Sequence, residues 1–118
     1  MSNPVCSMYS EGATEILTSV ASPGTATSID TRGFRTGMIA IRNYGGEDMH
    51  TLQYVIKSYA NYAGATAGAE EVSIADIAPN ATVTFVWTEK ARARFEVTIT
   101  PKVVGDQSQY KIEHCLAL

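Results

Sequence analysis

Large apolar residues occupy almost every second position of three segments in the second half of the chain, 82–88, 95–100 and 110–116. A period of two is the pattern of a β-strand that has one buried and one solvent-facing side. Antiparallel sheets often leave one face in water, whereas strands of parallel sheets usually read as unbroken apolar runs. The pattern therefore predicts an all-β protein, a single antiparallel β-sandwich of jelly-roll or immunoglobulin-like type with roughly seven to eight strands.

Turn-forming residues separate short β-rich segments along the whole chain. Ala21–Gly24 and Pro79-Asn80 are strong turn signals, and Thr88–Ala91 is a short connection with room for one helical turn. Residues 1–12 are interpreted as an N-terminal arm or edge segment, and residues 13–118 as the β-sandwich domain. Strands are expected at Thr14–Val20, Ala26–Asp30, Met38–Arg42, Leu52–Tyr59, Ala81–Trp87, Arg94–Thr100 and Ser108–Leu116, with short edge strands considered at Val5–Tyr9 and Glu70–Ile77.

The apolar phase of these strands predicts which side chains form the core. His114 falls on the inward phase of the last strand, and we interpret it as a hydrogen-bonded core residue rather than a catalytic base. The expected core residues are Ile39, Ile41, Ile56, Val83, Phe85, Trp87, Phe95, Val97, Ile99, Ile112 and Leu116.

Length and charge limit the classes of protein that fit. The chain has 118 residues, the size of one domain, and is 45% hydrophobic with a formal net charge of −3. This balance argues against nucleic-acid binding, because the basic residues Lys90, Arg92 and Arg94 stand beside Glu89 and Glu96 as at an ordinary solvated edge. No apolar run approaches the ~20 residues that cross a bilayer. The first residues show no secretory signal, so synthesis and assembly inside a cell are expected.

No pattern of residues indicates catalysis or metal binding. His50 and His114 are the two histidines, and Cys115 adjoins His114 on a strand whose neighbouring side chains face opposite sides. Known nucleophile, zinc and phosphate-loop motifs are absent from the sequence. The turn Gly45–Asp48 offers two carboxylates, whereas calcium takes six to eight oxygen ligands. We therefore expect a protein that is not an enzyme, with no catalytic, cofactor or metal residues.

The two cysteines, Cys6 and Cys115, lie near opposite ends of the chain. They can pair only where the two ends of the chain meet, and a reducing cytoplasm disfavours disulfides. Free thiols that behave as small apolar residues are therefore expected.

Tyrosines are concentrated in the middle of the chain. Tyr44, Tyr54, Tyr59 and Tyr62 fall within nineteen positions, flanked by alanine and glycine. Tyrosine is enriched at protein interfaces because it joins a large apolar ring to a polar tip. The alternative is that Tyr54 belongs to the core and the others are half-exposed strand residues. Together with apolar residues of the arm, the candidate interface residues are Val5, Met8, Tyr9, Tyr44, Tyr59 and Tyr62.

From Ile29 to Leu118 the order of elements resembles that of small β-sandwich virion proteins of tailed bacteriophages, in particular head decoration (cement) and other accessory proteins. The segments that carry the resemblance are Ile29–Phe34, a short apolar strand ending at Arg42-Asn43, Ile77–Phe85, the aromatic and arginine stretch Ala91–Val97, and a last strand that follows a glycine turn. They cover about three-quarters of the chain, and the motifs are shared by many β-sandwich modules.

The resemblance implies a non-enzymatic virion structural protein, most closely a capsid decoration protein. Its implied partners are the major capsid protein or another virion protein and further copies of itself, with neither nucleic acid nor membrane among them. Its implied location is the virion, assembled in the host cytoplasm. Two alternatives remain open, a non-viral adhesion or carbohydrate-binding module whose tyrosines stack on sugars, and a subunit of an extracellular filament.

Overall fold

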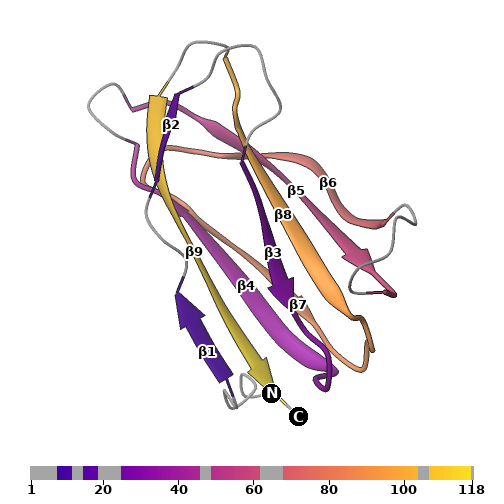
Figure 1. Ribbon diagram of the computed structural model, residues 1–118. Helices are drawn as coiled ribbons and strands as arrows, with labels where there is room; N and C mark the ends of the chain where they lie inside the picture. Colours follow the sequence, from indigo (N-terminus) through magenta and orange to yellow (C-terminus); the bar gives the residue numbers. More distant parts are fainter. Residues whose placement is uncertain are drawn as a thin grey trace.

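The protein is all-β, with nine strands in the part of the chain that the structure describes (Figure 1). This computed structural model describes residues 8–11, 15–18, 25–45, 49–61, 68–103 and 107–117. All the strands pair antiparallel, in two sheets. The predicted antiparallel β-sandwich is therefore confirmed. Within the described residues no helix is long and apolar enough to span a membrane.

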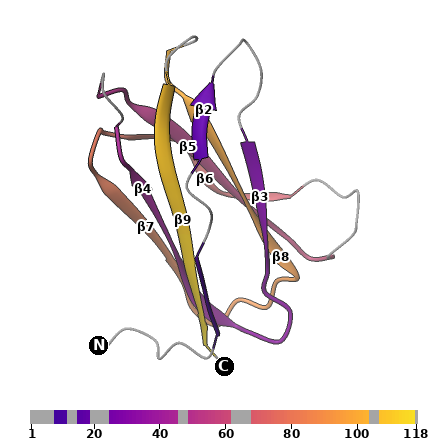
Figure 2. The ribbon, with the colours of Figure 1, turned by 60° about the vertical axis from the view of Figure 1, so that its left-hand side comes forward.

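The strands divide between two sheets that face each other (Figure 2). Sheet A has the order β1-β9-β4-β7, and β2 pairs with the same edge of β9 as β1 because β4 occupies the other edge. It consists of β1 (Met8–Glu11), β2 (Glu15–Thr18), β4 (Thr36–Asn43), β7 (Thr82–Trp87) and β9 (Gln107–Ala117). Sheet B has the order β3-β8-β5-β6 and consists of β3 (Thr25–Asp30), β5 (Leu52–Tyr59), β6 (Ala69–Ile77) and β8 (Arg94–Pro101).

The order in which the chain visits the two sheets defines the topology. The chain crosses from one sheet to the other at almost every connection, and the last strand, β9, lies between the first strands and β4. Because β1 and β2 share one edge of β9, each sheet has four strand positions, and their order is that of a jelly roll, which is one of the two predicted alternatives. Among the described strands, the edges of sheet A are β1 with β2 and β7, and the edges of sheet B are β3 and β6.

The core lies between the sheets and follows the predicted strand phase. Nine of the eleven predicted core residues are buried, and the other two, Val83 and Phe85, are half-buried and pack against the same cluster. The rings of Trp87 and Phe95 stack with their centroids 4.3 Å apart. Four further members of the core were not predicted, namely Ile29, Leu52, Ile77 and Tyr110.

Gly37 belongs to β4 and matters because of space. A Cβ atom at this position would lie 2.6 Å from Cζ2 of Trp87 and 2.7 Å from the carbonyl oxygen of Cys115. Gly33, in the preceding bend, has instead the positive φ of 87° that glycine adopts without strain. The connection Thr88–Ala91, which has room for one helical turn, is irregular instead, and Glu89 adopts a φ of 56°.

The expectation of free thiols is wrong for Cys115, which is disulfide-bonded and buried. The physical reason is the pairing of the first strand with the last, which sets Met8 opposite Leu116 and Tyr9 opposite Cys115. The sheet therefore brings the early part of the chain alongside its end, a contact that no local pattern reveals. The chain's other cysteine, Cys6, lies outside the described residues.

We expect alkylation of the denatured, unreduced protein to leave Cys115 unmodified. If the protein is reduced before it is denatured and alkylated, Cys115 should gain one alkyl group, as peptide mass spectrometry will show. A Cys115→Ser variant is the control for the assignment of that peptide. Alkylation of Cys115 without reduction would contradict the disulfide.

Candidate functional site

The predicted tyrosines are distributed between opposite ends of the sandwich. Tyr44 follows β4 at the end where β6 stops and β5 begins, whereas Tyr59 is the last residue of β5. A strand of this length spans about 23 Å, so these two residues do not share a surface. Tyr54, between them, is half-buried against the core. Met8 and Tyr9 lie in β1, of which only the backbone is described, and Val5 and Tyr62 lie outside the described residues.

Asn43 is the hub of a buried hydrogen-bond network at the Tyr44 end. Its Nδ2 donates to the carbonyl oxygens of His50, at 2.9 Å, and of Ile77, at 3.0 Å. Its Oδ1 accepts from the backbone N–H of Gly45, at 2.8 Å, and from the hydroxyl of Ser108, at 2.6 Å. The side chain has no exposed surface, and its hydrogen bonds satisfy the amide. One side chain thus joins the β4–β5 connection to the end of β6 and the start of β9.

The predicted strand Met38–Arg42 ends one residue before Asn43, but Asn43 continues the inward phase of Ile39 and Ile41. The signal that identifies it is therefore the strand phase, extended by one polar residue beyond the apolar run. Its backbone is held too, since the N–H of Asn43 donates to the carbonyl of Ala81 at 3.0 Å and that of Tyr44 to Gln109 at 2.8 Å.

Exposed residues adjoin this network in two contacting pairs, Arg42 with Tyr44 and Met49 with Asn80, here together called the Tyr44 surface. Tyr44 is 37% exposed and Met49 is 53% exposed. The guanidinium carbon of Arg42 lies 5.0 Å from the centroid of the Tyr44 ring, and Nδ2 of Asn80 lies 3.6 Å from the sulfur of Met49. Met49 and Asn80 adopt left-handed φ values of 55° and 64°. These exposed residues therefore adjoin backbone that the hydrogen bonds of Asn43 hold in place.

Tyr59, at the other end, is engaged by its own sheet. The guanidinium carbon of Arg94 lies 3.6 Å from the centroid of the Tyr59 ring, within the range of a cation–π contact. The hydroxyl of Tyr59 is 3.4 Å from Oε1 of Glu96, and Arg94 forms an ion pair with Glu96 at 3.3 Å. This ring therefore packs within the outer face of sheet B.

Lys90, in the connection between β7 and β8, is also paired. Lys90 forms an ion pair with Glu71 at 2.7 Å, and the hydroxyl of Ser58 donates to Glu71 at 2.6 Å. Burial acts to raise the pKa of Glu71, but the hydrogen bonds from Lys90 and Ser58 and the charges of Lys90 and Arg92 outweigh it, so the pKa falls below its ordinary value. The positive charge of Lys90 is thus matched by a carboxylate of sheet B.

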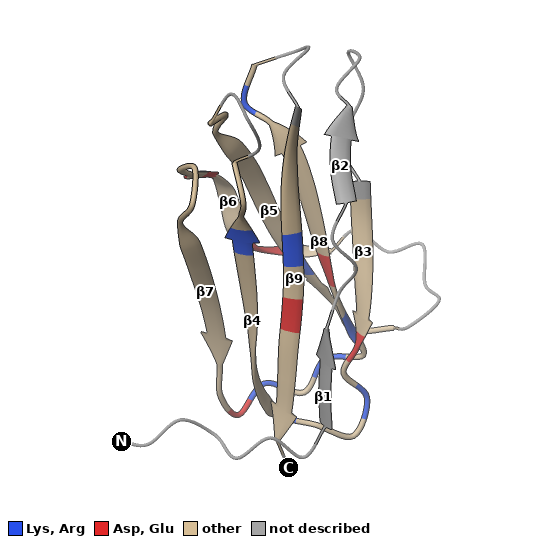
Figure 3. Ribbon diagram, turned by 90° about the vertical axis from the view of Figure 1, so that its left-hand side faces the viewer, with Lys and Arg blue, Asp and Glu red and all other residues tan. Residues whose placement is uncertain are grey.

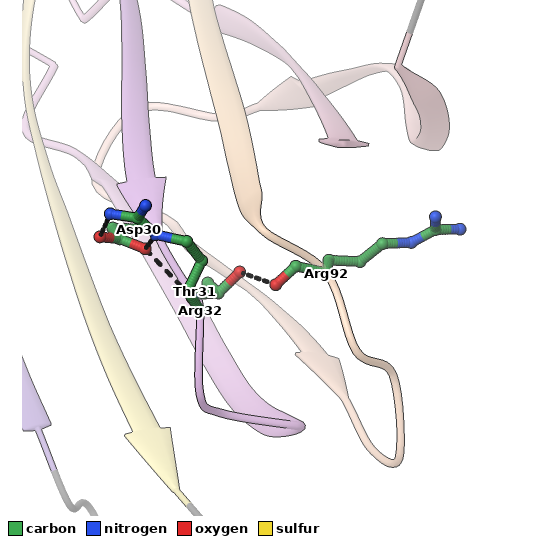
Figure 4. A network of polar contacts seen from close by, with 4 residues as sticks. All are labelled: Asp30, Thr31, Arg32 and Arg92. Carbon is green, nitrogen blue, oxygen red and sulfur yellow. Dashed lines mark hydrogen bonds and ion pairs between the residues drawn. The ribbon is translucent and has the colours of Figure 1, made fainter. Parts of the chain in front are cut away.

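A polar contact also anchors the bend after β3 (Figure 4). The hydroxyl of the buried Thr31 donates to the carbonyl oxygen of Arg92 at 2.9 Å, and its N–H donates to Ala93 at 3.1 Å. Arg32 donates from Nε and Nη2 to the carboxylate of Asp30, at 3.0 and 2.8 Å. The hydrogen bonds from Arg32 lower the pKa of Asp30. This contact ties the β3–β4 bend to the β7–β8 connection.

His114 occupies the inward face of β9, opposite Ile39 in the register with β4. It is half-buried, and desolvation lowers its pKa below the ordinary value of 6.5. Among the described residues, no group of three or more His, Cys, Asp or Glu side chains is placed to hold a metal ion. Gly46, Glu47 and Asp48, from the turn considered for calcium, lie outside the described residues.

We expect the free energy of unfolding to fall as the pH drops below 6.5, and His114 to account for part of this fall. Because the folded protein lowers the pKa of His114, the unfolded chain takes up this proton first. The stabilising contribution of neutral His114 is therefore present above pH 6.5 and is lost as the pH falls toward the lower folded-state pKa. The pKa values of three carboxylates, Asp30, Glu71 and Asp76, are also lowered. Their protonation affects the free energy of unfolding only below their ordinary pKa values of 3.8 to 4.5.

Urea unfolding of the parent and of a His114→Gln variant across this pH range measures the effect. The free energy of unfolding of the variant should change less with pH between neutral pH and the pH range in which carboxylates titrate. Parallel profiles for the two proteins would contradict the assignment to His114.

Comparisons with known proteins show the fold. No protein-family model and no curated protein sequence matches the chain. Among solved structures, the mitogen derived from Yersinia pseudotuberculosis superposes with a TM-score of 0.54 at 9% identity, over 92% of this chain and 85% of the mitogen. This likeness, at such low identity, shows a common β-sandwich architecture.

Two larger proteins contain a similar unit. The CBM22-1–GH10 modules of Clostridium thermocellum xylanase 10B, solved with xylohexaose, match 93% of this chain at a TM-score of 0.54 and 9% identity. The structure of infectious bursal disease virus Gx strain matches 94% at a TM-score of 0.54 and 9% identity. The matched regions cover 26% and 32% of those chains. The chain is therefore a jelly-roll β-sandwich of a kind found in viral, bacterial and modular proteins.

Proposed function

We propose that this chain is a non-enzymatic structural protein of a viral particle, a capsid decoration protein that binds the major capsid protein through the Tyr44 surface. The observation that carries the proposal is the exposure of Tyr44 and Met49, which follow and precede the network residues Asn43 and His50 in the chain. Aromatic residues, methionine and arginine are the types enriched at the centres of protein interfaces.

The hydrogen-bond network of Asn43 favours binding at the Tyr44 surface, because it reduces the conformational entropy that is lost when a partner binds. A loop that is held by buried hydrogen bonds loses little conformational entropy when a partner binds. The Asn43 amide and the backbone bonds of Asn43 and Tyr44 provide that hold. Modest contacts of this kind, repeated around a symmetric shell, give strong attachment through avidity.

The disulfide at Cys115 suits a protein that persists outside a reducing cytosol. Virion surfaces are among the environments in which disulfides persist. The jelly roll is also a common architecture of capsid proteins, although it hosts many other functions. The proposed location is therefore the exterior of the virion after its release from the host.

Co-sedimentation with empty capsids of the virus that carries this protein tests the proposal. A Tyr44→Ala variant should bind about ten-fold more weakly, as expected for the loss of an aromatic anchor. Ile74→Ala is the matched control, because Ile74 is 64% exposed on β6 in the other sheet. Equal binding by the parent and Tyr44→Ala would exclude the Tyr44 surface, and failure of the parent to bind would reject the decoration role.

A second candidate function rests on the same side chains. An exposed tyrosine ring with Arg42 beside it has the chemistry of a carbohydrate platform, in which the ring stacks on a sugar and the guanidinium binds hydroxyls. Calorimetric titration with xylohexaose is a direct probe. Binding that is lost in Tyr44→Ala and kept in Ile74→Ala would favour this function over capsid binding.

A further inference from the structure

Strand β7 forms an open edge of sheet A that has no charged residue. Its sequence, Thr-Val-Thr-Phe-Val-Trp over residues 82–87, also lacks glycine and proline. Among the described strands, β7 pairs only with β4. Figure 3 shows β7 at the border of the sheet, uncharged along its length, whereas β4 and β9 carry charged residues. An unprotected edge of this composition is a template for pairing with another strand.

The other edges carry the usual protection against strand addition. β6 contains Glu70, Glu71 and Asp76, and its register on β5 is interrupted by irregularities. The short strands β1 and β2 contain Glu11 and Glu15, and β3 ends at Asp30. Charges, bulges and short length each hinder edge-to-edge pairing. β7 differs from all of these edges.

The core is also incompletely covered along β7. Val83 and Phe85 point toward the core and pack against it, yet both are only half-buried. On the outer face of the same strand, Val86 is 53% exposed. A strand laid along this edge would shield all three side chains from water and would pair the open backbone groups of β7.

We propose that β7 is the interface through which two copies of this chain associate, with their β7 strands antiparallel about a two-fold axis so that sheet A continues across both copies. The strand is suited to self-pairing, because a two-fold axis through Thr84 or Phe85 keeps the inward and outward faces aligned. An axis through Thr84 gives a register with Thr82 opposite Val86, and an axis through Phe85 gives a register with Thr84 opposite Val86. Neither register opposes like charges within the strand.

This inference goes beyond the proposed function and does not depend on it. The Tyr44 surface is built from the end of β4 and the β4–β5 and β6–β7 connections, whereas the pairing uses the backbone edge of β7. Self-association is measured on the purified protein without capsids. The experiments can therefore reject dimerisation while supporting capsid binding, or reject capsid binding while supporting dimerisation.

Analytical ultracentrifugation of the purified full chain over a range of concentrations tests the pairing. The parent should shift from 12.7 kDa toward twice that mass as its concentration rises. The double variant Thr84→Lys with Val86→Lys opposes lysines in either register and should raise the dimer dissociation constant at least about ten-fold. The control, Ala26→Lys with Ser28→Lys, adds the same charge to exposed outward positions of the β3 edge and should dimerise like the parent.

Hydrogen exchange of the parent keeps the test decisive if the lysine variant unfolds. Backbone amides of residues 82–87 should become more protected as the concentration of the parent rises. A parent that stays monomeric at its highest soluble concentration would overturn the proposal. So would an assembly larger than a dimer, equal dimerisation of a folded Thr84→Lys, Val86→Lys variant, or concentration-dependent protection at another edge. Protection of β7 only in the presence of capsids would assign the edge to a capsid strand instead.

Discussion

Replacing Phe95 with alanine is expected to lower the free energy of unfolding by about 3–5 kcal/mol, the range for truncation of a buried phenylalanine. Phe95 has no exposed surface and lies between the two sheets, with its ring 4.3 Å from that of Trp87 and 5.9 Å from that of Phe85. Alanine would leave a cavity in this aromatic cluster, because close-packed neighbours relax only in part. Chemical denaturation followed by tryptophan fluorescence and by circular dichroism measures the change.

The matched control for Phe95 is Thr98→Ala, on the outer face of the same strand. Thr98 is half-buried between neighbouring strands, so its truncation should cost less than about 1 kcal/mol through lost strand preference and cross-strand contact. A Thr98→Ala variant that is destabilised as much as Phe95→Ala would show that the two faces of β8 are assigned wrongly.

The second large effect is expected at Asn43, where alanine should lower the free energy of unfolding by roughly 3 kcal/mol or more. The truncation leaves the N–H of Gly45, the Ser108 hydroxyl and the carbonyls of His50 and Ile77 without the amide that satisfies them. Each unsatisfied buried group costs about 1–3 kcal/mol. The same denaturation experiment measures it, and Ser108→Ala, which removes one of these hydrogen bonds, should cost less.

An Asn43→Asp variant separates loss of the donor from loss of volume. Aspartate keeps the acceptor for Gly45 and Ser108 but directs a second carboxylate oxygen at the carbonyls of His50 and Ile77. Burial and these carbonyls should raise the pKa of that aspartate in the folded state, so the variant should gain stability as the pH falls toward protonation. Stability of Asn43→Asp equal to that of the parent at neutral pH would contradict the hydrogen-bonded role of the amide.

The strand positions were accessible from local sequence because the alternation of residues is a local property. Leu52–Tyr59 was predicted with its observed bounds, and the other described strands differ from prediction mostly by one to three residues at an end. The phase within each strand also held, since Phe95, Val97 and Ile99 are fully buried as expected. One buried and one wet face impose this pattern on each strand without reference to its neighbours.

The candidate site was accessible only in part. The tyrosine-rich segment pointed to Tyr44, whose exposure suits an interface, but it grouped Tyr44 with Tyr59 at the other end of β5. Closeness in sequence does not predict closeness in space when a strand runs between two residues. Asn43 was missed because an asparagine after a strand has the same local signature in a solvated turn and in a buried network.

The amino-acid pattern alone determined the all-β class, the strands, their inward faces and the predominance of antiparallel pairing, all of which follow from the alternation of apolar and polar residues within short segments. The jelly-roll order, the pairing of β1 with β9, the disulfide of Cys115 and the open edge of β7 came from the tertiary structure. These features depend on which strands become neighbours, a choice made by the packing of the whole core and the closure of long loops. An isolated segment carries no record of that choice, so its partner strand is visible only in the assembled fold.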